Sequence, residues 1–146
     1  MQIRTSLVVC TLLLAMAVNP AAARRSAAPA RPLATASSLA QGLRAAGITV
    51  TAAGRITQPF FSVPARVFIA AGADLQVYQY RSAAAAGIDA GKISPSGSAI
   101  GTFMAQWMRP PHIFHKHNLI VVYLSDDARV RSWLAARLGP QIAGPQ

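Results

Sequence analysis

Five short stretches rich in β-branched and aromatic residues predict β-strands. They span residues 48–53, 66–71, 75–81, 102–109 and 118–124. The second and third are separated by the sequence AGAD, whose glycine favours a tight hairpin turn. The continuous apolar run at 119–124 predicts an interior strand that is covered on both faces.

Three stretches predict helices, at 39–46, 83–93 and 127–138. The last has Val130, Leu134 and Leu138 at four-residue spacing, which places them on one face. Start and stop signals flank each helix. The expected N-caps are Ser37 or Ser38 for the first, Ser82 for the second and Ser125 or Asp126 for the third, while Gly47 and Gly139 end the first and third.

The predicted order is therefore α-β-β-β-α-β-β-α. Because the strands run in hairpins with helices between them, we expect an α+β two-layer sandwich. Its antiparallel sheet should have about five strands, with the helices packed on one face. The domain should span residues 37–140, preceded by a flexible linker at 24–36 that is rich in Ala, Pro and Arg and followed by a tail at 141–146.

Residues 1–23 have the layout of a secretory signal peptide. Arg4 gives a positive start, an apolar stretch covers 7–18, and the alanines before position 24 predict cleavage after Ala23. The stretch is shorter than the ~20 residues of a transmembrane helix, and no later segment reaches that length without a charge. We therefore expect a secreted or periplasmic protein. The alternative is a signal that is retained as a membrane anchor.

The only cysteine, Cys10, lies inside this signal. The remainder of the chain then has no disulfide and no thiolate for catalysis or metal binding. It carries thirteen Lys and Arg residues against four Asp and no Glu, for a net charge of +9. Such a charge favours polyanions such as nucleic acid or acidic envelope polymers. The basic residues are spread singly after Arg25, however, which is more typical of a solvated surface.

The stretch 102–124 is the centre of the predicted fold. Residues 102–109 and 118–124 should form a hairpin through Pro110-Pro111 and a corner that holds all three histidines, with Trp107 at the centre of the sheet. The histidines His112, His115 and His117 are weak metal-ligand candidates. Alternation along a strand separates His112 from the other two, so a bend would be needed to gather them.

Phe60 and Phe61 lie in the proline-flanked segment QPFFSVP. Two readings are open for this segment: an aromatic lip over a ligand pocket, or a loop docked over a sheet edge. A second loop, 94–101, offers several serines, and His112 would be the base for them. The loop matches neither a nucleophile elbow nor a phosphate loop. We therefore expect no enzyme, no catalytic residue and no cofactor.

The segments QPFFSVP, LQVYQYRS, SPSGSAIGT and PPHIFHKHNLIVVYLSDD, in this order and spacing, resemble a group of small bacterial exported proteins, many of them lipid-anchored. The likeness covers most of residues 46–144. It implies no known activity, cofactor or partner. The matching positions include His112 but not His115 and His117, and this chain lacks a cysteine placed for lipid anchoring.

These observations predict a non-enzymatic binding or accessory module of the cell envelope. The first alternative is a basic polyanion binder, and the second is a protein with a histidine-based metal site. The sequence identifies no ligand-binding residue, partner or oligomeric state.

Overall fold

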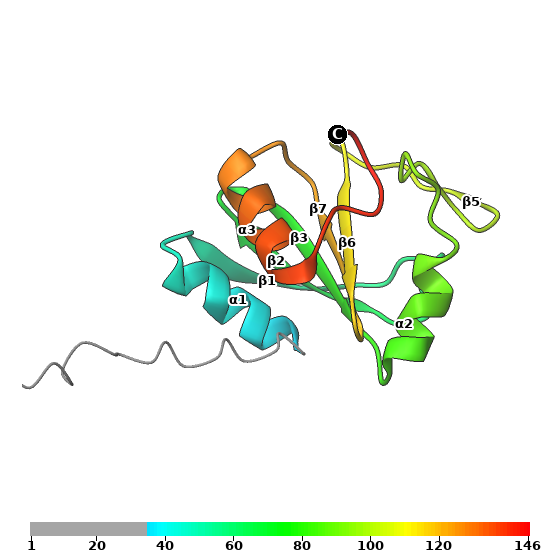
Figure 1. The fold of residues 1–146 in the computed structure, drawn as a ribbon, viewed down its shortest axis with the longest axis horizontal. Coiled ribbons are helices and arrows are strands. Elements are labelled where there is room, and N and C mark those ends of the chain that lie inside the picture. The colour runs from blue at the N-terminus through cyan, green and yellow to red at the C-terminus, as the bar shows by residue number, and fades with distance from the viewer. Residues whose placement is uncertain (1–34) are drawn as a thin grey trace, which may run out of the picture. The chain divides into compact units, whose positions relative to one another are not determined.

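The structure is a computed structural model, and it describes residues 35–146. The predicted signal peptide and most of the predicted linker lie outside the described residues. A five-stranded antiparallel sheet with the order β1-β2-β3-β7-β6 forms the middle of the domain (Figure 1). Its strands are β1 (Val50–Ile56), β2 (Ala65–Ala70), β3 (Ala73–Gln79), β6 (His112–Lys116) and β7 (Leu119–Tyr123).

Three helices and a small hairpin complete the described chain. The helices are α1 (Ala36–Ala45), α2 (Ala83–Ala90) and α3 (Ala128–Leu138), and the hairpin consists of β4 (Ala99–Ile100) and β5 (Phe103–Met104). The element classes and the predicted order α-β-β-β-α-β-β-α are confirmed, as is the α+β class. None of these helices is both long enough and apolar enough to span a bilayer.

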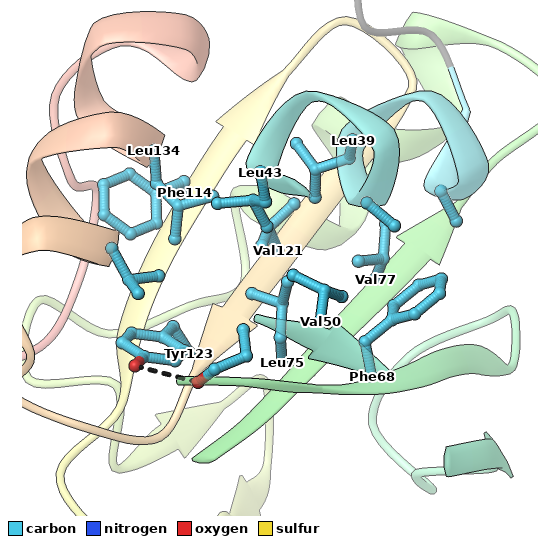
Figure 2. Packing of buried hydrophobic residues seen from close by; sticks show 14 of the residues in the cluster. Leu39, Leu43, Val50, Phe68, Leu75, Val77, Phe114, Val121, Tyr123 and Leu134 are labelled. Atoms are coloured by element: carbon cyan, nitrogen blue, oxygen red, sulfur yellow. Dashed lines mark hydrogen bonds between the residues drawn. The ribbon is translucent and has the colours of Figure 1, made fainter. Parts of the chain in front are cut away.

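One face of the sheet is covered by α1 and α3. Figure 2 shows Leu39 and Leu43 of α1 and Leu134 of α3 pointing toward the sheet residues. The sheet contributes Val77 from β3 and Val121 from β7, two of its three interior strands, and both valines are completely buried. The regular spacing of leucines along each helix brings them onto the face that meets these valines.

The opposite face is also apolar, because residues of β7 alternate between the two sides. Ile120 and Val122 point away from α1 and α3 and are completely buried. They pack with Tyr78 of β3 and with Ala86 of α2. The expectation that helices pack on one face therefore holds for α1 and α3 but not for α2. A strand that is apolar on both faces requires cover on both.

The predicted hairpin of 102–109 with 118–124 is wrong. The strand that forms a hairpin with β7 is β6, which consists of residues expected to form a His-rich corner, while β3 pairs with the other edge of β7. The turn lies at His117, whose φ of 51° lets the chain reverse directly between Lys116 and Leu119. Of residues 102–109 only Phe103 and Met104 form a strand, and Trp107 lies outside the five-stranded sheet.

The predicted helix boundaries agree with the structure to within a few residues. Ser82 caps α2, and the predicted left-handed turn after α1 occurs at Gly47, with φ of 76°. The N-cap of α1 is Thr35 rather than Ser37 or Ser38, because Thr35 and Ser38 form a reciprocal capping box. The N-cap of α3 is Asp127, whose carboxylate accepts from Val130 N at 2.9 Å.

The domain extends beyond both predicted boundaries. It begins in the expected linker at the α1 cap, and the expected tail packs on edge strand β6. Ile113 N donates to Ala143 O at 3.0 Å, and Ala143 is 1% exposed. Gly144 has φ of 108°, and a Cβ at this position would clash with the carbonyl of Pro111. The tail is therefore a structural part of the sheet edge.

Candidate ligand-binding cleft

The loop after β1 carries two adjacent phenylalanines that point in different directions. Phe61 is buried, and its ring centroid lies 4.3 Å from that of Tyr78 on β3. Phe60 is half-buried and meets the Trp107 ring edge-on at 5.6 Å. Trp107 is itself held by a hydrogen bond from Nε1 to Gly97 O at 2.8 Å. The loop therefore docks on a face of the sheet rather than over its edge.

A buried carboxylate ties this loop to α2. Asp89 is 2% exposed, and its Oδ2 accepts from Ser62 N at 2.8 Å and from the Ser62 hydroxyl at 2.7 Å. The Tyr80 hydroxyl donates to the same oxygen at 2.9 Å. Lys92 Nζ donates to the other oxygen, Oδ1, at 2.8 Å. Four donors from three segments thus converge on one side chain.

These contacts set the protonation states of the cluster. Burial by itself raises the pKa of Asp89, but the bonds from Lys92, Ser62 and Tyr80 outweigh it and lower the pKa to about 2. Burial, together with the bond to Asp89 and its charge, raises the pKa of Tyr80 well above the ordinary value. Near neutral pH Asp89 is a carboxylate and Tyr80 a protonated donor. The hydrogen bonds of this cluster, which we call the anchor, therefore hold the loop against α2.

A cleft of about 420 Å³ opens beside this anchor. One wall is the loop 59–62, and the other is formed by residues 100–103, which make up most of the β4–β5 hairpin. Asp89 and Lys92 also line the cleft. In Figure 1 the β4–β5 hairpin and α2 lie on the other side of the sheet from α1 and α3. The cleft therefore lies on the α2 side of the sheet, and the buried residues Phe61 and Ile100 of that side form part of its lining.

The lining of the cleft is mostly apolar, with one cation. Three phenylalanine rings contribute to it, from Phe60, Phe61 and Phe103, and Phe103 is 46% exposed. Lys92 keeps 47% of its side chain exposed while it contacts Asp89, so its ammonium group can also donate to a ligand. A preformed apolar cleft with a few placed polar groups is typical of small-molecule sites.

His112 does not take part in this cleft. It is completely buried on β6, where Nε2 lies 2.8 Å from Asp126 Oδ1 and Nδ1 lies 2.7 Å from Gln141 Oε1. Asp126 precedes α3 and Gln141 follows it, so the imidazole connects both ends of this helix to the sheet. With both ring nitrogens bonded to its own chain, His112 has no free nitrogen to act as a general base.

The three histidines are not gathered. His115 is the third residue after His112 on β6 and therefore points to the opposite face, and His117 is exposed in the turn. His115 Nε2 lies 3.2 Å from the backbone oxygen of His117. Within residues 35–146, no three His, Cys, Asp or Glu side chains are close enough together to hold a metal ion.

The serines of the 94–101 loop form a local network. The hydroxyls of Ser96 and Ser98 lie 2.7 Å apart, and Ser94 Oγ accepts from Ala99 N at 3.0 Å. The bonds of these hydroxyls are to one another and to the backbone of their own loop. Such bonds stabilise a tight loop and leave no hydroxyl paired with a histidine base.

Many of the basic side chains that suggested polyanion binding are used within the domain. Arg129 donates to Ala46 O at the end of α1, and Arg137 stacks over the Trp133 ring. Arg44 donates to Val50 O. Cations at a helix C-terminus and over aromatic rings stabilise the fold itself. These contacts favour a structural role for a large part of the positive charge.

Sequence reasoning proposed the aromatic lip but did not find the Asp89 cluster. Asp89 is the only charged residue of α2, a helix that is otherwise alanine, glycine and isoleucine. A lone acid in a helix that packs closely on a sheet is the signal that would have identified it, since a buried carboxylate needs donors. Its donors Ser62 and Tyr80 come from segments that the sequence does not show to be neighbours.

No protein-family model matches the chain, and neither the curated proteins nor the solved structures contain a match. The functional argument therefore depends on the geometry of the described residues.

Proposed function

We propose that the protein is an exported, non-enzymatic binding module of the cell envelope, and that its ligand occupies the cleft between the 59–62 loop and the β4–β5 hairpin. The observation that carries this proposal is the cleft itself, with its aromatic lining and its fixed anchor at Asp89. Export and membership of the family of small exported proteins are supported by the N-terminal sequence and the segment pattern.

The lining defines the class of ligand. The Phe60 and Phe103 rings offer faces and edges on which a flat ring can stack, and stacked or edge-on contacts are favourable beyond the area they bury. Lys92 supplies a donor at the rim. The fitting ligand therefore has an aromatic or sugar ring and an acceptor oxygen near it. An amide carbonyl is a suitable acceptor.

Binding without catalysis is supported by the state of the reactive groups. The Asp89 carboxylate is saturated by donors, and both nitrogens of His112 are bonded within the chain. The polyanion alternative is less supported, because basic side chains such as Arg129 and Arg137 contact their own domain. The metal alternative lacks a cluster of ligands among the described residues.

The test is a titration of the ¹⁵N-labelled protein with benzamide and with N-acetylglucosamine, each of which has a ring and an amide carbonyl. We expect saturable shifts of the amide signals of residues 59–62 and 100–103. The indole signal of Trp107 should move as well, because its ring contacts Phe60.

Two variants on the same hairpin provide the control. Phe103→Ala removes a ring that lines the cleft and should weaken binding about tenfold, whereas Met104→Ala should leave it unchanged, because Met104 is 74% exposed and does not line the cleft. Shifts spread over the surface, or equal effects of the two variants, would contradict the proposal.

A further inference from the structure

A second cavity lies between α3 and the C-terminal segment. It has a volume of about 250 Å³ and opens beside β6, where Phe114 forms part of its lining. The α3 residues that line it are Ala128, Arg131, Ser132 and Ala135. These positions recur at helical spacing and form one stripe on α3. The two alanines have no side chain beyond Cβ, which leaves room next to the arginine.

Arg131 has a guanidinium group without a counter-charge. Among residues 35–146 Lys92 pairs with Asp89, and the His112 ring contacts Asp126, whereas no carboxylate lies within ion-pair distance of Arg131. Its Nε is buried and has no hydrogen-bond partner among the described residues. A buried donor of a charged group that lacks an acceptor is costly, and an incoming oxygen atom would remove that cost.

The other polar groups around the cavity are oriented by the fold. Gln141 accepts from the buried His112 ring at 2.7 Å and donates through Nε2 to Pro145 O at 2.8 Å. The segment that closes one side of the cavity is thus fixed to the sheet. Ser132 adds a hydroxyl one residue after Arg131. The cavity therefore has a cation, a hydroxyl and a fixed wall, and none of its lining side chains is acidic, although Gln146, the last residue of the sequence, also lines it.

We infer that this cavity is an oxyanion site, in which the guanidinium of Arg131 binds a carboxylate or phosphate group. Planar guanidinium groups bind both of these groups through paired hydrogen bonds. A small rotation of the side chain toward the anion gives Nε the acceptor that it lacks. The apolar part of a larger ligand would contact Phe114. This site is separate from the cleft beside Asp89, with which it shares no lining residue.

The test is a titration of the ¹⁵N-labelled protein with sodium phosphate and, separately, with sodium acetate, at an ionic strength held constant with sodium chloride. Saturable shifts confined to residues 128–135, to Gln141 and to the Arg131 Nε–H signal are expected for at least one of the two anions. The anion that binds more tightly identifies the group as phosphate or carboxylate.

Three variants distinguish binding of the anion inside the cavity from general attraction of anions to a basic surface. Arg131→Gln should weaken binding about tenfold or more, the effect of losing a charged hydrogen bond. Arg137→Gln removes the same charge from the same helix outside the cavity and should leave binding unchanged. Ala135→Leu keeps every charge but fills the cavity, and it should also abolish binding.

Absence of saturable shifts at tens of millimolar anion would overturn the inference. Equal weakening by Arg131→Gln and Arg137→Gln would overturn it as well, since that result indicates diffuse attraction to a basic surface. Unchanged binding in Ala135→Leu would place the anion outside the cavity. The dispersion of the amide signals shows directly whether each variant is folded.

Discussion

Replacing Asp89 with asparagine removes the negative charge at the centre of the anchor, while the side chain keeps nearly the same shape. The lowering of the pKa from 3.8 to about 2 corresponds to about 2 kcal/mol of stability, at 1.36 kcal/mol for each pKa unit. The carboxylate is 2% exposed, so solvent screening reduces this figure little. For a domain of this size, Asp89→Asn should lower Tm by roughly 8 °C near neutral pH.

The stability that Asp89→Asn loses should become smaller as the pH falls. The folded pKa is depressed, so the stabilisation is fully present above the unfolded pKa of 3.8 and disappears as the pH falls through the folded pKa of about 2. The difference between wild type and Asp89→Asn should therefore be about 2 kcal/mol at pH 6, about half of that at pH 3, and below about 0.5 kcal/mol at pH 2.

Urea unfolding at a series of pH values, followed by tryptophan fluorescence, measures this difference. The matched control is Asp74→Asn, an exposed aspartate at the start of β3, which should shift stability by less than about 0.5 kcal/mol. The reasoning would be refuted if the free energies of unfolding of wild type and Asp89→Asn differed by the same amount at every pH from 6 to 2. The donors around Asp89 would then not hold it in the ionised form.

Three further substitutions test the rest of the fold, each by urea unfolding. Thr35→Ala should cost about 1 kcal/mol because it removes the N-cap of α1, whereas Ser37→Ala should cost less than about 0.5 kcal/mol; the reverse order would restore Ser37 as the cap. His112→Ala removes a buried ring and its two partly buried hydrogen bonds and should cost about 2–3 kcal/mol, and His115→Ala should be nearly neutral. Leu134→Ala leaves a cavity beneath α3 and should cost about 2–5 kcal/mol, and a loss below about 1 kcal/mol would contradict the packing in Figure 2.

Much of the fold was predictable because its signals are local. The cap at Ser82, the turn at Gly47 and the apolar run of β7 each depend on a few consecutive residues. The pairing of β6 with β7 was not predictable in this way. Its turn uses His117 in a left-handed conformation, which non-glycine residues adopt infrequently, and the apolar pattern around Trp107 competed for the same partner strand.

The candidate site was predictable only in part. Two adjacent phenylalanines in a proline-flanked loop allowed two interpretations, an aromatic lip or a loop docked over a sheet edge, and Phe60 does line the cleft. The polar anchor was not predictable, because Ser62 lies 27 residues from Asp89 and the two meet only after α2 packs on the sheet. His112 attracted attention as a candidate for chemistry, but its two bonds to the segments that flank α3 give it a structural role.

The most direct measurement of the central claim is the set of amide shift changes on adding benzamide or N-acetylglucosamine, compared between wild type, Phe103→Ala and Met104→Ala. The binding account predicts saturable shifts at residues 59–62 and 100–103 that weaken about tenfold in Phe103→Ala and persist in Met104→Ala. The binding account would be contradicted if neither probe produced localised shifts at these residues.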